Sequence, residues 1–258
     1  MSTGLPRTIY GPVASWRLGR SLGVDLVSRA QKTCSFDCSY CQLGPTQVRT
    51  IERREFVPTS RLVAELEALP SLALDFVTFS GCGEPTLALN LREAVRVVKA
   101  RLGAPVAVLT NSSLFSDPEV RRALAAVDLV VAKLDAWDAE GLSVINRPAP
   151  GITWAGVWEG LRALRAERDH GLALQMMFCE ANQHHAAALA ALARELAVDE
   201  VQVNTPLRPS PVRPLSREEM RLVMGSFAGL PALCVYDASR PQVEPLERAE
   251  TLARRPVL

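Results

Sequence analysis

Short apolar runs alternate with longer amphipathic stretches along most of the chain. The runs are rich in Val, Leu, Ala and Phe and have the length expected of buried strands, about four to eight residues. We expect six such strands, at residues 24–27, 76–80, 106–110, 128–134, 172–178 and 201–204.

The stretches between these strands show the periodicity of helices. From residue 91 onward, apolar residues recur near the helical repeat, at Leu91, Ala94, Val95, Val98 and Leu102. A serine near a start or a proline in a first turn marks other helix beginnings. We therefore expect helices at 60–66, 91–102, from about 116, at 153–167 and at 184–196.

Strands that alternate with helices predict a parallel sheet with right-handed crossovers. Six units predict an α/β fold of the partial (β/α)6 TIM-type barrel class, whose chemistry lies at the C-terminal ends of the strands. Gly and Pro interrupt residues 1–22, so an irregular N-terminal segment is expected there. The barrel is expected at 23–206, and 207–258 is expected to be a C-terminal extension.

That extension begins with a proline-rich linker at 207–214, which suits neither a strand nor a helix interior. A helix at 216–225, a short strand at 232–236 and a weak helix at 246–253 are expected after it.

Composition agrees with one enzyme-sized domain. The chain has 258 residues, of which 48% are hydrophobic, and its net charge is +1, so nothing global indicates a nucleic-acid binder. Residues 1–61, however, hold nine basic and four acidic side chains. Such a local excess favours an anionic ligand or RNA; a solvated Arg-rich surface is the alternative.

Three cysteines follow the first expected strand in the spacing C-x3-C-x2-C, namely Cys34, Cys38 and Cys41. A [4Fe–4S] cluster normally takes four thiolates, so three on one loop leave one iron open to a small molecule. The alternatives are a zinc ion, which prefers two C-x2-C pairs or a Cys/His set, and plain buried thiols. The scattered Cys179 and Cys234 are expected to be buried small hydrophobes, as is Cys82.

The cysteine loop, including the aromatic Tyr40 before its third cysteine, resembles the signature of the radical S-adenosylmethionine (SAM) superfamily. The resemblance implies that Cys34, Cys38 and Cys41 ligate a [4Fe–4S] cluster whose open iron chelates SAM. It also implies reductive cleavage of SAM to methionine and a 5′-deoxyadenosyl radical, which abstracts a hydrogen from the substrate. The protein would position these cofactors and exclude water.

A second motif follows the strand at 76–80 directly and reads Gly81-Cys82-Gly83-Glu84-Pro85. Glycines allow a backbone to approach a ligand closely, although such a sequence alone is usually a turn. Here it resembles the superfamily's Gly-Gly-Glu-Pro motif. The resemblance implies that Glu84 and the strand-end backbone bind the amino group of SAM.

Polar residues also end or line the later strands. Strand alternation points each of two pairs to one face, Lys133 with Asp135 and Gln175 with Met177. A turn or helix cap at Asn111-Ser112, a salt bridge at Lys133-Asp135 and core packing of Met177 are the alternatives. The expected SAM contacts outside the second motif are Tyr40, Asn111, Ser112, Lys133, Asp135, Gln175, Met177 and Asn204.

Further segments resemble one subgroup, the wyosine-biosynthesis-like radical SAM Fe–S oxidoreductases. They lie at 10–13, 17–25, 133–135, 145–148 and 203–206, and the resemblance spans about 8–237. The tRNA-wyosine synthase carries extra cysteines before the radical motif, whereas residues 1–33 contain none, so that reaction is not expected.

The sequence therefore predicts a radical SAM enzyme whose substrate, an RNA base or a peptide, stays open. We expect an electron donor of flavodoxin or ferredoxin type. The compact barrel is also similar to activases of glycyl-radical enzymes, and a non-catalytic Fe–S or zinc-binding sensor is a further alternative. No signal peptide or run of ~20 apolar residues occurs, and the loop needs reduced thiols, so we expect a cytoplasmic protein without membrane contact.

Overall fold

The computed structural model describes residues 6–28 and 31–256. Its main sheet has eight strands in the order β1-β2-β5-β6-β7-β8-β9-β10. Neighbouring strands from β2 to β10 pair in parallel, and β1 pairs with β2 in the antiparallel sense. The strands are β1 (Ile9–Ser15), β2 (Gly19–Val24), β5 (Phe76–Phe79), β6 (Val106–Thr110), β7 (Leu129–Lys133), β8 (Leu172–Met177), β9 (Glu200–Asn204) and β10 (Ala232–Cys234).

A second, two-stranded sheet pairs β3 (Thr33–Cys34) with β4 (Val48–Arg49) in parallel. The main helices are α1 (Thr59–Glu67), α2 (Leu91–Leu102), α3 (Pro118–Leu124), α5 (Trp154–Ala166), α6 (Ala186–Leu196), α7 (Arg217–Gly225) and α8 (Arg248–Arg254). Short turns of helix are η1 (Pro85–Leu87), α4 (Ala139–Gly141), η2 (Leu142–Asn146) and η3 (Gln183–His185).

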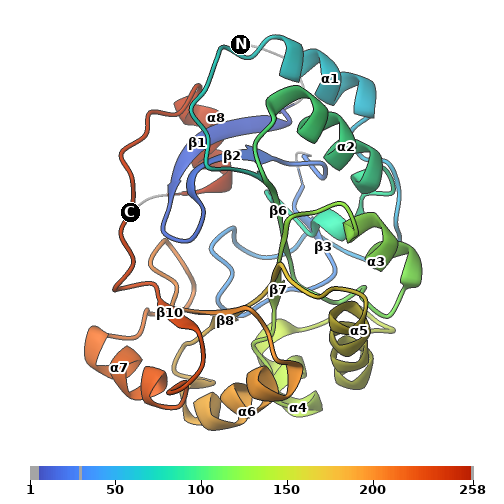
Figure 1. Cartoon of the computed structure of the whole chain (residues 1–258). Coiled ribbons are helices and arrows are strands. Elements are labelled where there is room, and N and C mark those ends of the chain that lie inside the picture. The colour runs from blue at the N-terminus through green and yellow to red at the C-terminus, as the bar shows by residue number, and fades with distance from the viewer. Residues whose placement is uncertain (1–5, 29–30, 257–258) are drawn as a thin grey trace.

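The sheet curls into a half-barrel, with the helices around its outside and the segment that carries the cysteines inside the curl (Figure 1). The expected partial-barrel class is thus confirmed, and five of the six expected strands are β5 to β9. The expected helix at 91–102 coincides with α2. The strand expected at 24–27 lies earlier, at β2.

The N-terminal segment, expected to be irregular, is instead the β1–β2 hairpin. Gly11 and Pro12 fall where the pairing register shifts, between Tyr10 and Val13. A proline is tolerated there because β1 is an edge strand and needs no donor on its outer side. Gly11 and Pro12, which argued against regular structure here, therefore occupy a bulge within a strand.

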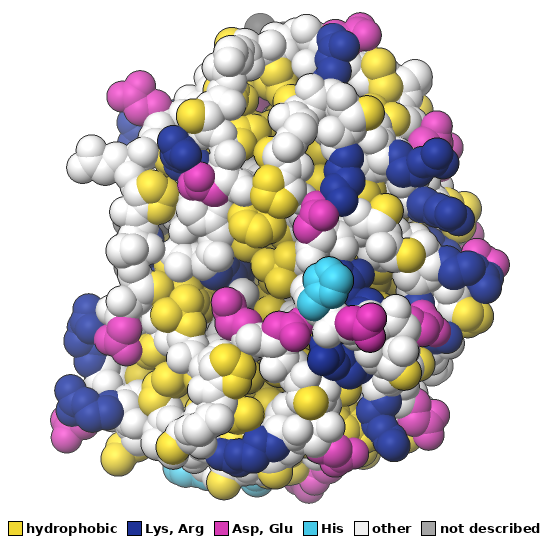
Figure 2. Space-filling model, in the orientation of Figure 1, with side chains coloured by type: hydrophobic (Ala, Val, Ile, Leu, Met, Phe, Trp, Pro, Cys, Tyr) yellow, Lys and Arg dark blue, Asp and Glu magenta, His cyan; other side chains and the backbone are white. Residues whose placement is uncertain are grey.

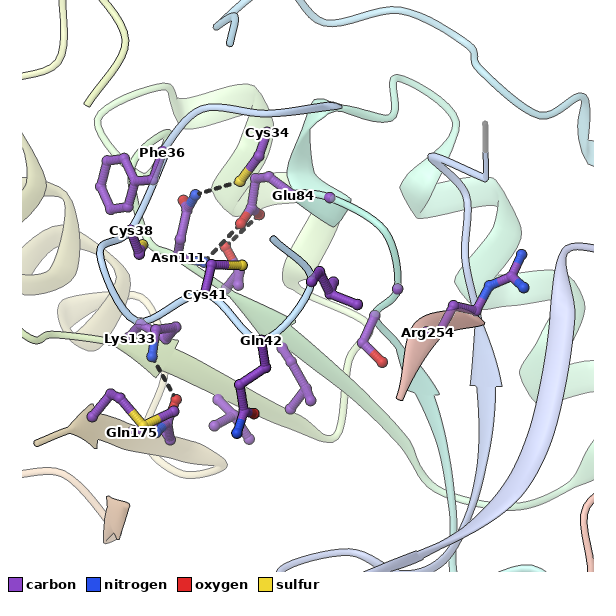
Figure 3. Close-up of a pocket in the computed structure, with 18 of the residues that line it drawn as sticks. Cys34, Phe36, Cys38, Cys41, Gln42, Glu84, Asn111, Lys133, Gln175 and Arg254 are labelled. Atoms are coloured by element: carbon purple, nitrogen blue, oxygen red, sulfur yellow. Dashed lines mark hydrogen bonds between the residues drawn. The ribbon is translucent and has the colours of Figure 1, made fainter. Parts of the chain in front are cut away.

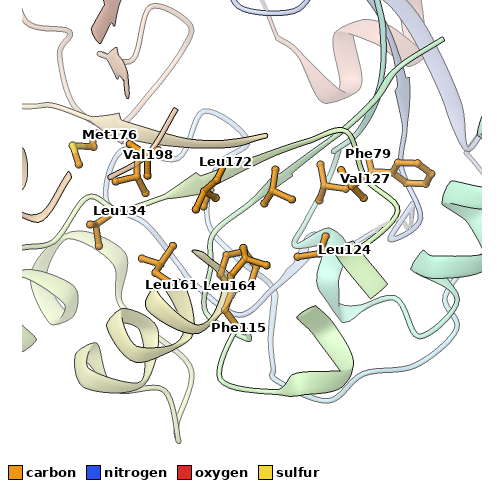
Figure 4. Close-up of a cluster of buried hydrophobic side chains, with 14 of the residues drawn as sticks. Phe79, Phe115, Leu124, Val127, Leu134, Leu161, Leu164, Leu172, Met176 and Val198 are labelled. Carbon is orange, nitrogen blue, oxygen red and sulfur yellow. The ribbon is translucent and has the colours of Figure 1, made fainter. Parts of the chain in front are cut away.

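Between the helices and the sheet lies the main hydrophobic core (Figure 4). Phe79, Leu172 and Met176 of the strands are fully buried there, as are Phe115 and Leu161 from the helical side. Burying each such side chain stabilises the fold by about 1.5–3 kcal/mol. This packing makes the half-barrel a firm support for the loops at its mouth.

The C-terminal extension joins the same sheet and then crosses to its opposite edge. β10 pairs with β9 at one edge, whereas α8 lies beside β1 at the other (Figure 1). The Gly11 amide donates to Thr251 Oγ1 at 3.1 Å, and the Leu246 amide donates to the Gly11 carbonyl at 2.7 Å. The two edges of the half-barrel are therefore connected by the tail.

On the face shown in Figure 2, hydrophobic side chains form a band down the middle and charged side chains of both signs lie around it. Within the described part of the chain, none of the helices is both long enough and apolar enough to span a bilayer.

Candidate active site

A cavity of about 230 Å³ lies at the mouth of the half-barrel (Figure 3). The cysteine loop forms one side of it, and the ends of β5 to β9 form its floor. Side chains from the β1–β2 turn, the segment after β9 and α8 complete it. Residues far apart in sequence thus meet at the C-terminal ends of parallel strands, where barrel enzymes hold their sites.

Gly83 allows the cysteine loop to lie directly on the end of β5. A Cβ atom at residue 83 would lie 1.8 Å from the Thr33 carbonyl oxygen, and the Glu84 amide donates to that oxygen at 3.3 Å. At Gly81, with φ of +155°, a Cβ atom would lie 2.1 Å from Asp25 Cγ. Gly81 and Gly83 were predicted to let a ligand approach the backbone. In the structure they let other segments of the chain pack against it.

Each of the three cysteine sulfurs lies beside a nitrogen donor. Asn111 Nδ2 is 3.5 Å from Cys34 Sγ, and Asn146 Nδ2 is 3.4 Å from Cys38 Sγ. Lys32 Nζ donates to Cys41 Sγ at 3.0 Å. Donors of this kind stabilise thiolates that ligate metals and tune the metal centre.

Burial disfavours the thiolate form of two of these cysteines. It raises the pKa of Cys38 to about 11, with a further contribution from Asp135. The pKa of Cys34 is raised too, by burial first and then by Glu84. Such thiols are expected to lose their protons when a metal binds to their sulfur atoms, since metal binding and deprotonation are coupled.

The three thiols fit a cluster because they come from one loop and line one cavity. Among the described residues, no three His, Cys, Asp or Glu side chains stand close enough together to hold a single metal ion. A cubane instead distributes three thiolates over three irons. Cys34, Cys38 and Cys41 are the residues that would hold it.

Glu84 lies at the floor of the cavity and is only 2% exposed. Its Oε1 accepts hydrogen bonds from the Thr86 amide (3.0 Å), Thr86 Oγ1 (2.7 Å) and Thr110 Oγ1 (2.6 Å). Its Oε2 accepts one from the Asn111 amide at 2.7 Å. Burial raises the pKa of this carboxyl, and these hydrogen bonds act in the opposite direction. Glu84 thus ties the end of β5 to the end of β6 while Oε2 keeps capacity for one more donor.

A second buried carboxylate, Asp135, connects the cysteine loop to the strand ends through hydrogen bonds. It accepts hydrogen bonds from the Tyr40 hydroxyl, from Asn146 Nδ2 (3.0 Å) and from the Met177 amide (2.7 Å). Lys133 Nζ lies 3.3 Å from Asp135 Oδ1. The loop's aromatic residue is therefore fixed to the ends of β7 and β8.

Polar groups at the ends of β7 and β8 face the cavity itself. Lys133 Nζ donates to Gln175 Oε1 at 2.8 Å and lies 5.0 Å from the centre of the Tyr40 ring. Gln175 Nε2 is buried and has no hydrogen-bond partner among the residues that the structure describes. A donor of this kind lining a cavity is suited to a ligand acceptor.

Most of the predicted site residues meet at this cavity, and three do not line it. Ser112 donates to the Lys133 carbonyl at 2.9 Å, the Cys82 amide donates to Asp25 Oδ2 at 2.9 Å, and Asp135 lies beneath Tyr40. Those that line the cavity are Cys34, Cys38, Tyr40, Cys41, Gly81, Gly83, Glu84, Asn111, Lys133, Gln175, Met177 and Asn204.

Sequence reasoning missed the arginines of the cavity. They come from the β1–β2 turn, the proline-rich segment and the tail, and no motif connects these positions. The basic excess of residues 1–61 was one available signal, because Arg17 and Lys32 contribute to it. The cavity arginines are Arg17, Arg208, Arg254 and Arg255.

Comparisons with known proteins agree with this geometry. Residues 29–193 match the model of the radical SAM superfamily, so the chain belongs to that superfamily. A UPF0026 protein from Synechocystis is 39% identical over 214 residues, which are 83% of this chain and 80% of the relative. The chain is therefore also a member of the UPF0026 family.

Solved structures share the fold. Streptococcus suis SuiB bound to S-adenosylmethionine has a TM-score of 0.60 at 14% identity, over 79% of this chain and 48% of SuiB. The methyltransferase TsrM from Kitasatospora setae, solved with cobalamin and a [4Fe–4S] cluster, has a TM-score of 0.53 at 21% identity, over 76% of this chain and 38% of TsrM. The chain thus spans about half or less of these proteins. The wyosine-biosynthesis-like subgroup stays a prediction.

Proposed function

We propose that this chain is a radical SAM enzyme whose SAM binds in the cavity between the cysteine loop and the ends of β5 to β9. The observation that carries the proposal is that three closely spaced cysteines and a buried glutamate, from separate segments, line one cavity. A [4Fe–4S] cluster held there by Cys34, Cys38 and Cys41 would supply the electron for cleavage of SAM to methionine and a 5′-deoxyadenosyl radical, which would abstract a hydrogen from the substrate.

The protein's own residues would bind SAM, orient it and shield the site from water. Cys34, Cys38 and Cys41 are the thiolate ligands. Oε2 of Glu84 is suited to the ammonium of SAM, since a charge-assisted hydrogen bond in a buried site is strong. Gln175 Nε2 offers a donor to an acceptor on SAM, and the Tyr40 ring packs with Met177 and Cys38 at the floor. Asn204, at the end of β9, is suited to the ribose or adenine.

Anaerobic reconstitution tests the proposal. We expect about four irons and four sulfides per chain, by analogy with a single cubane, and 5′-deoxyadenosine after addition of SAM and dithionite. A cluster that forms without cleaving SAM would support a non-catalytic sensor, and zinc alone would support a structural metal site. Both results would contradict the proposal.

The reaction beyond SAM cleavage is open, and two of the candidate classes make different demands. A modified RNA base requires RNA binding that weakens with salt, whereas an activase requires a protein partner that gains a glycyl radical. A flavodoxin or ferredoxin is the proposed physiological electron donor. Replacing dithionite by either reduced protein in the cleavage assay tests that part separately.

A further inference from the structure

One side of the cavity is lined by arginines, which we call the arginine wall: Arg17, Arg208, Arg254 and Arg255. They come from the β1–β2 turn, the segment after β9 and the end of α8. Among the described residues that line the cavity, six are Lys or Arg, and Glu84 alone is acidic. Basic side chains therefore outnumber acidic ones among the groups that line the cavity.

Arg254 is already neutralised. Its Nε lies 3.1 Å from Asp25 Oδ2 and its Nη1 lies 2.6 Å from Glu250 Oε2. Its Nη2 donates to Ser28 Oγ at 2.5 Å. Arg254 therefore anchors α8 to the loop after β2, and Figure 3 shows it at the right of the view, with its guanidinium turned away from the other labelled side chains.

Arg208 has hydrogen-bond partners but no carboxylate. Its Nε and Nη2 donate to Gln42 Oε1 at 3.0 and 2.7 Å. Gln42 follows Cys41 directly, so this contact also holds the cysteine loop. Burial and, after it, the nearby charge of Arg255 lower the pKa of Arg208 to about 10.

Arg17 is the least satisfied of the four. Its Nε and Nη1 atoms are buried and have no hydrogen-bond partner within residues 6–28 and 31–256, and its guanidinium lies over the Trp16 ring, 5.4 Å from the ring centre. Burial, then Arg255 and Arg208, lower the pKa of Arg17 to about 9; Glu200 acts in the opposite direction. In the described part of the chain, neither Arg17 nor Arg255 has a carboxylate within ion-pair distance.

Three guanidinium groups so close together repel one another, and a buried cation without an anion is costly. Such an arrangement is suited to an anionic ligand that enters the cavity. A carboxylate carries one charge and two oxygens, whereas a phosphate monoester carries about −1.5 to −2 and three acceptor oxygens. Arginine forks match phosphate oxygens in pairs, so phosphate fits three arginines better.

We propose that Arg17, Arg208 and Arg255 bind a terminal phosphate group of the substrate. The proposal rests on the proposed function, because it places the substrate in the same cavity as SAM. The phosphate is terminal because Arg17 Nε and Nη1 are buried, so that only the end of a molecule comes close to this guanidinium. The phosphate lies beside Arg208, whose Nε and Nη2 donate to Gln42, whereas SAM lies nearer to Glu84 and Gln175.

Equilibrium binding to the purified full chain tests this inference, with inorganic phosphate as the probe and acetate as its monovalent comparison. We expect phosphate to bind more tightly than acetate. Arg17→Gln and Arg255→Gln should each weaken phosphate binding about ten- to a hundredfold, as expected for the loss of a charge-assisted hydrogen bond. Arg162→Gln, on the exposed face of α5, should leave it unchanged. Thermal unfolding of each variant verifies that it is folded.

Two further ligands separate the sources of the phosphate. Both ligands are measured with SAM already bound, so that the adenosine site of SAM is filled. If adenosine monophosphate then binds more tightly than glycerol 3-phosphate, the substrate is a nucleotide; equal affinities assign recognition to the phosphate alone.

Phosphate binding no tighter than acetate binding, or unchanged in both arginine variants, would overturn the inference. So would a loss of SAM affinity in the two variants, since it would assign the arginines to the SAM carboxylate. SAM cleavage by the reconstituted parent is measured independently, so a failure of the arginine wall is distinguishable from a failure of the proposed function.

Discussion

The floor of the cavity and its arginine wall differ in how far their charged side chains are paired within the protein. On the floor, Glu84 accepts four hydrogen bonds and Asp135 accepts three and lies beside Lys133. On the wall, Arg17 has two buried nitrogens without a partner. Since buried charges are stable when they are satisfied within the protein, the two carboxylates of the floor are stable without a ligand, whereas Arg17 is suited to an anionic ligand.

This difference distinguishes residues that hold the site together from residues that bind. Glu84 ties β5 to β6, and Asp135 ties the cysteine loop to β7 and β8, so their loss would affect the framework as well as any ligand. Gln175 is the exception on the floor, because its Nε2 is unpaired. It resembles the arginines in that respect, and it should contribute to binding more than to stability.

The largest expected effect removes the floor's metal ligands. Replacing Cys34, Cys38 or Cys41 with alanine should abolish both iron retention and SAM cleavage, because three thiolates are the minimum that holds a cubane at three corners. Iron content after anaerobic reconstitution measures it. Cys82→Ala, Cys179→Ala and Cys234→Ala are the controls and should keep iron near the parent level. A Cys34→Ala protein that cleaves SAM at the parent rate would contradict the assignment.

The second-largest expected effect comes from a steric change in the floor of the cavity. Gly83→Ala places a Cβ atom 1.8 Å from the Thr33 backbone, which cannot yield without displacing the cysteine loop. We expect a loss of about 1–3 kcal/mol in the free energy of unfolding, as for overpacking in a core, together with lower iron content. Denaturant titration measures the free energy of unfolding. Gly225→Ala on α7, where a Cβ atom meets nothing within 4 Å, should not destabilise the chain.

Glu84→Gln keeps the shape of the floor but removes its charge. SAM should bind roughly ten- to a hundredfold more weakly, since a charge-assisted hydrogen bond is worth about 1.5–3 kcal/mol. The amide also presents an NH2 group where the carboxylate accepted hydrogen bonds, so stability should fall too. Glu159→Gln on the exposed face of α5 is the matched control. Unchanged SAM affinity in Glu84→Gln would remove this residue from the SAM site.

The smallest expected effect is on the stability of the ligand-free arginine wall. Arg17→Gln removes a half-buried cation that has no carboxylate of the described residues within ion-pair distance, so the free energy of unfolding should stay the same or rise by up to about 1 kcal/mol. The same denaturant titration applied to Glu84→Gln should show a loss. If Arg17→Gln instead destabilises the chain as much as Glu84→Gln does, Arg17 is a framework residue and the contrast between floor and wall is wrong.

The parts of the fold that depend on local pattern were predictable from the sequence. Apolar runs predicted β5 to β9, and the spacing of Leu91 to Leu102 predicted α2. The cysteine loop and the Glu84 motif were predictable because each is contiguous and follows a strand. The β1–β2 hairpin was missed because its Gly11 and Pro12 occupy a bulge, whose geometry depends on the partner strand.

The arginine wall was not predictable for a different reason. Arg17, Arg208 and Arg255 are distant in the chain and come together only because the tail runs from β10 back to β1. No local spacing signals such a convergence. The same is true of Asp135, which sequence reasoning placed at the ligand and which the structure places beneath Tyr40.

The most direct test of the division between floor and wall is a crossed binding measurement. The affinities for SAM and for phosphate are determined on the reconstituted parent, on Glu84→Gln and on Arg17→Gln. We expect Glu84→Gln to lose affinity for SAM and keep its affinity for phosphate, and Arg17→Gln to do the reverse. If either variant loses both affinities while it remains folded and keeps its iron, the two sides do not act separately and the account is contradicted.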